Sequence, residues 1–165
     1  MLMFRILCAV FVAWAMNWAF TRPEAAFLLE EMPEFAMLAP LAGAVVGFQN
    51  LARRQGWGMV VAVANGLWSG FMSLILASCF YIAIKVFDTS RTGRFDTAFV
   101  LDLIGETTAD VVDYLASVPL VVIVLGATAV VGVLTELIHW ALVRLRKQRG
   151  IEERNTRRAH RPSMY

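Results

Sequence analysis

The sequence has little of what a catalytic or metal centre needs. Its 165 residues include two cysteines, Cys8 and Cys79, and two histidines. The cysteines form no Cys-x-x-Cys pair and no zinc-binding spacing, and they lie too far apart in the expected topology for a disulfide. The chain also lacks a phosphate-binding loop, a dinucleotide-binding glycine motif and a nucleophile elbow. We therefore expect a protein that is not an enzyme and that carries no cofactor and no metal.

Charged residues are also scarce. They make up 17% of the chain, whereas hydrophobic residues make up 59%. Soluble domains contain about 25% charged and 45–50% apolar residues, so an ordinary soluble domain is excluded. The mean hydropathy of +0.63 is typical of several membrane spans joined by modest loops.

Four apolar runs are long enough to cross a membrane, because about 20 residues span the bilayer core as a helix. They cover residues 1–20, 35–52, 59–84 and 119–143. A cleaved signal sequence is the alternative for the first run, since Arg5 precedes the apolar residues and small residues flank Trp14. We keep this run as a span. The fold class is then an all-α membrane protein, with residues 1–149 as a single four-span domain and residues 150–165 as a basic tail.

An amphipathic helix is predicted between the third and fourth spans, over residues 94–117. Its acidic residues recur at intervals of four, four and three positions, which places them on one face: Asp102, Glu106, Asp110 and Asp113. Apolar residues such as Val100, Leu101, Ile104, Val111, Val112 and Leu115 lie opposite. We expect this helix to lie along the membrane surface or over the ends of the spans. The acidic face lacks the loop pattern of a calcium site, so we interpret it as a solvated face. A second acidic segment, residues 21–34, could form another short surface helix.

The basic residues predict the orientation of the chain. If both termini and the turn at 53–58 are cytoplasmic, the inner side holds 11 Lys and Arg residues and the outer side holds 4. Eight of the inner residues form a basic cluster at the C-terminus: Arg144, Arg146, Lys147, Arg149, Arg154, Arg157, Arg158 and Arg161. Such a cluster is expected to contact anionic lipid. No nucleic-acid partner is expected, because the cluster lacks interleaved aromatic residues and a recognisable module.

Small and polar residues within the spans predict close helix packing. They are Gly43 and Gly47 in the second span, Asn65, Gly66 and Gly70 in the third, and Gly132 in the fourth. Small residues spaced by three positions let helix backbones approach each other, and they specify no activity. Asn65 is interpreted as a structural hydrogen-bonding group rather than a transport residue.

Glu136 is the one carboxylate inside an apolar run. An ionised group at this depth is costly unless it faces protein or water, so Glu136 is expected to face a neighbouring helix. Its candidate partners are Arg5 and Arg53, and protonation is the alternative. Glu136 and His139 have the Glu-x-x-His spacing of di-iron bundles, but no second pair exists, so a metal site is not expected. On this interpretation Glu136→Gln should be mild, because the amide keeps the shape and most hydrogen bonds.

The chain resembles the TrgA family of small bacterial inner-membrane proteins named for tellurite resistance. The similarity runs over most of the length. It rests on Gly43 and Gly47, on Arg54, Gly56 and Gly58, on Asn65-Gly66-Leu67, on Arg94-Phe95-Asp96 and Asp113-Tyr114, and on Pro119, Gly126, Gly132 and Glu136. The resemblance implies a multi-pass inner-membrane protein that contributes to tellurite or oxyanion tolerance, and it implies no catalytic residue.

Three functions are consistent with these patterns. The first is a TrgA-like contribution to oxyanion tolerance by an indirect, non-catalytic route. The second is an accessory or assembly subunit of a larger membrane complex, respiratory or photosynthetic. The third is a small transporter that uses Glu136 as a proton relay.

Overall fold

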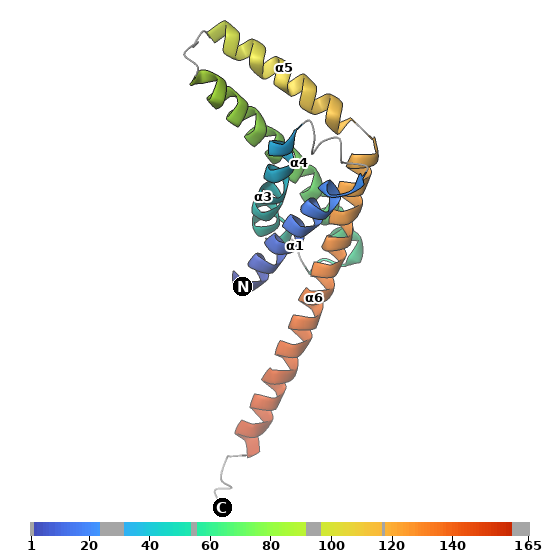
Figure 1. Ribbon diagram of the computed structural model, residues 1–165. Helices are drawn as coiled ribbons and strands as arrows, with labels where there is room; N and C mark the ends of the chain where they lie inside the picture. Colours follow the sequence, from blue (N-terminus) through green and yellow to red (C-terminus); the bar gives the residue numbers. More distant parts are fainter. Residues whose placement is uncertain (1, 24–31, 54–55, 92–96, 117, 160–165) are drawn as a thin grey trace, which may run out of the picture.

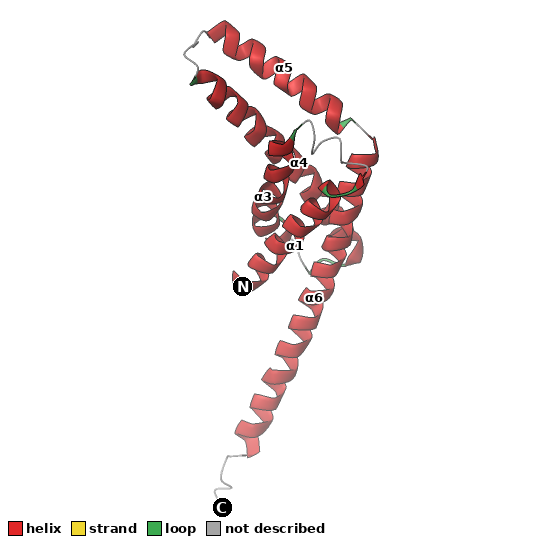
Figure 2. Ribbon diagram, viewed as in Figure 1, coloured by secondary structure: helices red, strands yellow, loops and turns green. Residues whose placement is uncertain are grey.

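The computed structural model describes residues 2–23, 32–53, 56–91, 97–116 and 118–159, with the side chains of 90, 118 and 149–159 left undescribed. These segments consist of helices joined by short turns, and they contain no strand (Figure 1, Figure 2). The elements are α1 (Leu2–Phe20), α3 (Pro33–Gln49), the short 3-10 helix η2 (Leu51–Arg53), α4 (Met59–Ser90), α5 (Thr97–Leu115) and α6 (Val118–Ala159).

Within these described residues, four helices are long and apolar enough to cross a membrane. The candidate spans are Leu2–Phe20, Pro33–Arg53, Met59–Thr89 and Pro119–Gln148. The prediction of an all-α protein with four spans is therefore confirmed. The third and fourth spans run five residues further than predicted, because α4 and α6 continue without a break beyond the apolar residues.

The last helix does not end where the basic tail was predicted to begin. α6 runs unbroken to Ala159, so the predicted boundary at residue 149 lies inside a helix. The residues beyond the span are rich in Arg, Lys, Gln and Glu, which are good helix formers, and no proline interrupts them. Figure 1 shows this part of α6 projecting well beyond the other helices.

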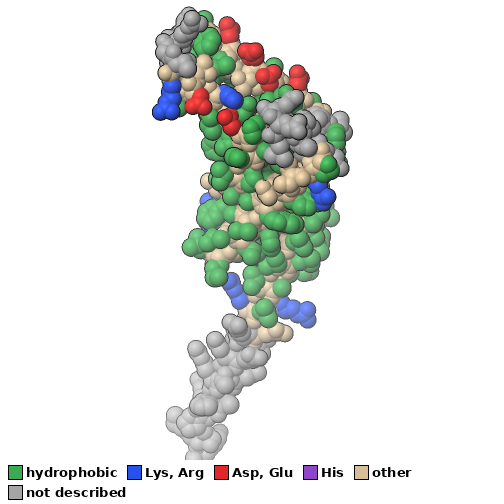
Figure 3. Space-filling view, viewed as in Figure 1, with side chains coloured by type: hydrophobic (Ala, Val, Ile, Leu, Met, Phe, Trp, Pro, Cys, Tyr) green, Lys and Arg blue, Asp and Glu red, His purple; other side chains and the backbone are tan. Residues whose placement is uncertain are grey.

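The four long helices pack as a bundle in which each contacts two main neighbours. α1 packs on α3, α3 on α4, α4 on α6, and α6 on α1. Fully buried apolar side chains such as Val12, Met16, Ala39, Leu120 and Val124 form the core. Large apolar side chains also cover the outside of the bundle (Figure 3), as expected for helices whose outer faces contact lipid.

Glycines set the distance between neighbouring helices at two seams. Gly43 and Gly47 on α3 face α1, where an added Cβ at Gly47 would lie 3.0 Å from the Cα of Ala9. On the other seam, Gly66 on α4 lies against the Thr128 carbonyl oxygen of α6, and Gly132 on α6 lies against the Ala62 carbonyl oxygen of α4. These backbones are in direct contact, which only small residues permit.

The end of the bundle that carries α5 is closed by aromatic contacts and an ion pair. The Phe35 ring on α3 lies 5.8 Å from the Phe20 ring of α1 and 5.9 Å from the Tyr81 ring of α4, centroid to centroid. The Lys85 ammonium of α4 lies 3.2 Å from a carboxylate oxygen of Glu34 on α3. Both charged groups are about half exposed, so the pair contributes at most ~1 kcal/mol.

α5 lies beyond this end and packs only lightly on the bundle. It corresponds to the predicted amphipathic helix, and Thr107 and Val111 are its buried residues. Its four acidic side chains are exposed and gather with the charges at the top of Figure 3. Alignment of α5 with a membrane surface stays a prediction. The other predicted surface helix falls mostly on residues 24–31, which lie outside the described residues.

The packing of α4 against α6 leads us to expect different effects from alanine substitution at two glycines of α6. Gly132→Ala should lower stability, because its Cβ would collide with the Ala62 carbonyl and lie 3.0 Å from the Cα of Gly66. Overpacking of this kind costs roughly 1–3 kcal/mol. Gly126→Ala should be neutral or slightly stabilising, because an added Cβ there meets nothing within 4 Å and alanine favours helix. Thermal unfolding of the purified variants in detergent compares the two; equal midpoints would contradict the packing of this seam.

Candidate functional site

The buried carboxylate of Glu136 accepts three part-buried hydrogen bonds. Its side chain is 1% exposed. Oε2 accepts a hydrogen bond from the backbone N–H of Gly56 at 2.8 Å, and Oε1 accepts one from the N–H of Gly58 at 3.1 Å. Oε1 also accepts from the indole Nε1–H of Trp140, one turn further along α6, at 3.1 Å. We call these four residues the Glu136 clasp.

The two glycines bring the loop backbone onto the carboxylate. Gly56 has φ +96° and Gly58 has φ +101°, a region that other residues adopt at a cost of about 1–2 kcal/mol. Gly58 immediately precedes Met59, the first residue of α4, and no side chain from its own segment caps that helix. Glu136 therefore supplies from α6 the acceptor that the start of α4 lacks. A negative charge at a helix N-terminus is also favoured by the helix dipole.

The partners of Glu136 differ from those expected. Arg5 and Arg53 were the predicted partners, yet neither forms an ion pair with Glu136 within the described part of the chain, and backbone N–H groups take their place. Glycines have no side chain, so their N–H groups reach the buried carboxylate without bringing a large group with them. Each hydrogen bond to a charged acceptor contributes about 1.5–3 kcal/mol, which offsets the cost of burying the carboxylate.

His139 packs beside the clasp and is not part of it. Its ring lies 5.6 Å from the Phe4 ring of α1 in an edge-on arrangement. A Cβ added at Gly56 would lie 3.2 Å from His139 Nε2, so the loop passes close over the imidazole. Glu136 and His139 therefore both adjoin Gly56, but only Glu136 forms a hydrogen bond with it. No group of three or more potential ligands is placed to hold a metal among the described residues.

The other predicted residues lie away from the clasp, at several separate places. Asn65 is 7% exposed and lines a small cavity of about 260 Å³ with Arg53, Trp57 and Val61, near the start of α4. The packing glycines lie on the two seams described above. The acidic face of α5 lies at the opposite end of the bundle from the clasp, so the structure does not bring it together with Glu136.

Sequence reasoning missed three contributors. Thr128 faces Gly66 and Gly70 where α6 contacts α4, and its hydroxyl donates to the Val124 carbonyl oxygen at 2.9 Å. Its signal in the sequence was its position four residues before Gly132 and eight before Glu136, which places it on the same face of a helix. The role of Gly56 and Gly58 as hydrogen-bond donors to the carboxylate was also missed. The signal in the sequence was the pair of glycines separated by one residue just before a span.

No protein-family model, curated protein or solved structure matches this chain. The fold and the four apolar helices define the class, a multi-pass helical membrane protein. The contacts of Glu136 fit a structural carboxylate, since both oxygens are taken up by fixed N–H donors.

These contacts change the expected effect of Glu136→Gln. All three partners donate hydrogen bonds, whereas the glutamine amide has one acceptor oxygen and an NH₂ group that faces at least one donor. We expect a loss of about 1.5–3 kcal/mol, not a mild effect. Glu106→Gln on the exposed face of α5 is the matched control and should leave stability unchanged. Chemical or thermal unfolding in detergent measures both; a Glu136→Gln protein as stable as the control would rule out the clasp as a major support.

Proposed function

We propose that the protein is a TrgA-like integral protein of the bacterial inner membrane that contributes to tellurite or related oxyanion tolerance by an indirect, non-catalytic route. The observation that supports this is the position of the residues on which the resemblance rests. Seven of them form helix seams or the Glu136 clasp: Gly43, Gly47, Gly56, Gly58, Gly66, Gly132 and Glu136. A sequence pattern made of packing residues is expected of a protein that acts as a folded unit in the membrane.

The buried polar groups favour an indirect route over oxyanion transport. Within the described part of the chain, the one buried charged side chain is Glu136, whose negative charge opposes an anion. The buried hydroxyls of Ser73, Thr128 and Thr135 donate to carbonyl oxygens of their own helices. Nothing in this interior offers an anion a favourable path. The protein would then act by supporting other membrane machinery, such as redox or transport components.

Deleting the gene tests this function. The deletion strain should become more sensitive to tellurite, and expression of the intact protein should restore growth. Glu106→Gln should complement fully, whereas Glu136→Gln should complement only in proportion to the amount of protein that accumulates, measured by immunoblot. A deletion strain that tolerates tellurite like its parent would remove the basis of the proposal. Loss of complementation by Glu136→Gln at normal abundance would instead favour the proton-relay transporter.

An accessory subunit of a larger membrane complex is the second candidate, and α5 favours it. This helix leaves apolar side chains uncovered beside its acidic face, including Leu101 at 67% and Val112 at 56% exposure. A partner protein would cover them. Purification in mild detergent separates the two candidates, because a subunit migrates with a large complex at fixed stoichiometry and a stand-alone protein does not.

The charge distribution supports an orientation with both termini in the cytoplasm. Arg5 and Arg53 lie at the same end of the bundle as Arg146, and α5 lies at the other end. Positive residues favour the cytoplasmic side. A reporter active only outside the cytoplasm should therefore work when fused near Asp102 and fail near Gly56.

A further inference from the structure

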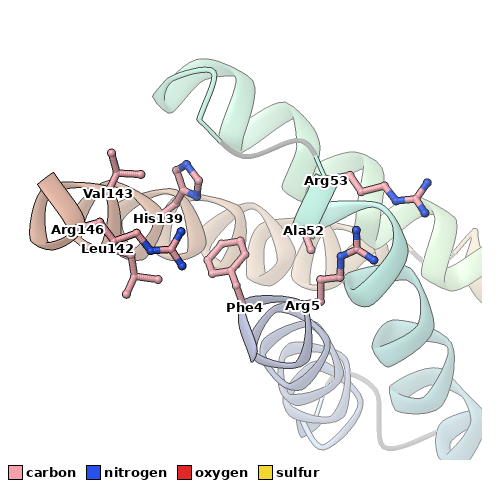
Figure 4. A pocket seen from close by; sticks show the side chains of 8 residues that line it. All are labelled: Phe4, Arg5, Ala52, Arg53, His139, Leu142, Val143 and Arg146. Atoms are coloured by element: carbon pink, nitrogen blue, oxygen red, sulfur yellow. The ribbon is translucent and has the colours of Figure 1, made fainter. Parts of the chain in front are cut away.

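A cavity lies between α1, η2 and α6 at the end of the bundle that carries the clasp. Its volume is about 370 Å³, and its lining combines cationic and apolar side chains: Phe4, Arg5, Ala52, Arg53, His139, Leu142, Val143 and Arg146. We call it the arginine pocket. Figure 4 shows Arg5 and Arg53 toward one end of it and Arg146 toward the other, with Phe4 and His139 between them.

Among the described residues, no carboxylate forms an ion pair with the arginines of this pocket, Arg5, Arg53 and Arg146. The guanidinium of Arg5 lies 5.8 Å from the centre of the Phe48 ring, which holds it at the pocket without reducing its charge. The nearest buried carboxylate on α6, Glu136, is already committed to the clasp. Three guanidinium groups around one pocket, with no carboxylate of the described residues ion-paired to them, make it attractive to an anion from outside the chain.

The residue types that line the pocket indicate which class of anion it binds. Guanidinium groups recognise phosphate oxygens in a bidentate manner. Phe4, Leu142 and Val143 add an apolar wall beside them, and Leu142 and Val143 are exposed on a helix that spans the membrane. A free inorganic anion gains nothing from such a wall, whereas a lipid has acyl chains to place against it. Basic pockets between membrane helices are typical sites for anionic lipid headgroups.

We propose that the arginine pocket binds the headgroup of an anionic phospholipid, which the guanidinium groups of Arg5, Arg53 and Arg146 around the pocket attract, with Phe4 and Leu142 contacting the first part of the acyl chains. This site shares Arg146 with the basic cluster at the C-terminus, whereas Arg5 and Arg53 come from α1 and η2. The proposal does not depend on the proposed role in oxyanion tolerance.

The test uses the full chain, purified in detergent and freed of lipid. Binding of short-chain phosphatidylglycerol is measured by native mass spectrometry or calorimetry at fixed salt, with short-chain phosphatidylcholine and inorganic phosphate as separate probes. Phosphatidylglycerol should bind more tightly than either. Phosphate binding as tightly as the lipid would contradict the lipid assignment, and so would equal binding of the two lipids.

Matched variants locate the site. Arg5→Gln with Arg146→Gln should weaken phosphatidylglycerol binding at least about tenfold, since each removes a charged hydrogen bond. Arg144→Gln with Lys147→Gln removes the same charge from the adjacent surface of α6 and should weaken binding clearly less than the first pair does, because neither residue lines the pocket. Arg146→Gln alone alters an exposed side chain and serves if the double variant fails to fold. Equal weakening by both pairs would overturn the proposal.

Discussion

The hydrogen bonds between Glu136 and the loop that precedes α4 are the contact on which the rest of the bundle depends. A carboxylate in an apolar helix is tolerated only if its oxygens are satisfied. Here they are satisfied by N–H groups of Gly56 and Gly58, which belong to the segment that connects the second and third spans. One side chain therefore offsets its own cost of burial, caps α4 and attaches the connecting loop to α6. Loss of the carboxylate would leave part-buried N–H donors without this acceptor.

The clasp also fixes the register of α4 against α6, which is the position of one helix along the other. Moving from the clasp toward α5, the same two helices meet at Gly132 with Ala62, and then at Thr128 with Gly66 and Gly70. These contacts are spaced by about one helical turn each, so a shift of one helix would break all of them together. The polar groups and small residues along this interface thus determine together how α4 and α6 pack. Within a membrane the hydrophobic effect gives little preference for one arrangement of apolar helices over another.

The charged residues are placed at the two ends of this seam. Exposed acidic side chains lie along one face of α5. Arginines that form no ion pair with the described residues line the pocket beside the clasp. His139 belongs to both neighbourhoods at the arginine end, since it lines the pocket and lies under Gly56. The described interior between the ends holds hydroxyl groups bonded to their own helices. This distribution leaves the charged side chains of the described residues concentrated at the two ends of the bundle.

The sequence was sufficient for the coarse architecture and insufficient for the contacts of the site. Long apolar runs reveal spans because the bilayer demands length and apolarity, and the spacing of Asp102 to Asp113 revealed α5 because helices repeat every 3.6 residues. Helix ends were less predictable, since Arg and Lys continue α6 as readily as apolar residues do. The prediction of arginine partners for Glu136 was wrong for a physical reason. Charge complementarity suggested arginine as the partner. Nearly every residue has a backbone N–H, however, so the sequence does not show which N–H groups will donate, and only the positive φ angles of Gly56 and Gly58 bring theirs into reach.

Hydrogen exchange of the Gly56 and Gly58 amides tests the clasp most directly. In the intact protein both amides should exchange slowly, because each donates to a carboxylate that is 1% exposed. In Glu136→Gln at least one of them should exchange at least about tenfold faster, as expected for the loss of about 1.5–3 kcal/mol of local protection. Amides in the middle of α1 provide the internal reference. Unchanged exchange at both glycines in the variant would contradict the account of how this bundle is held together.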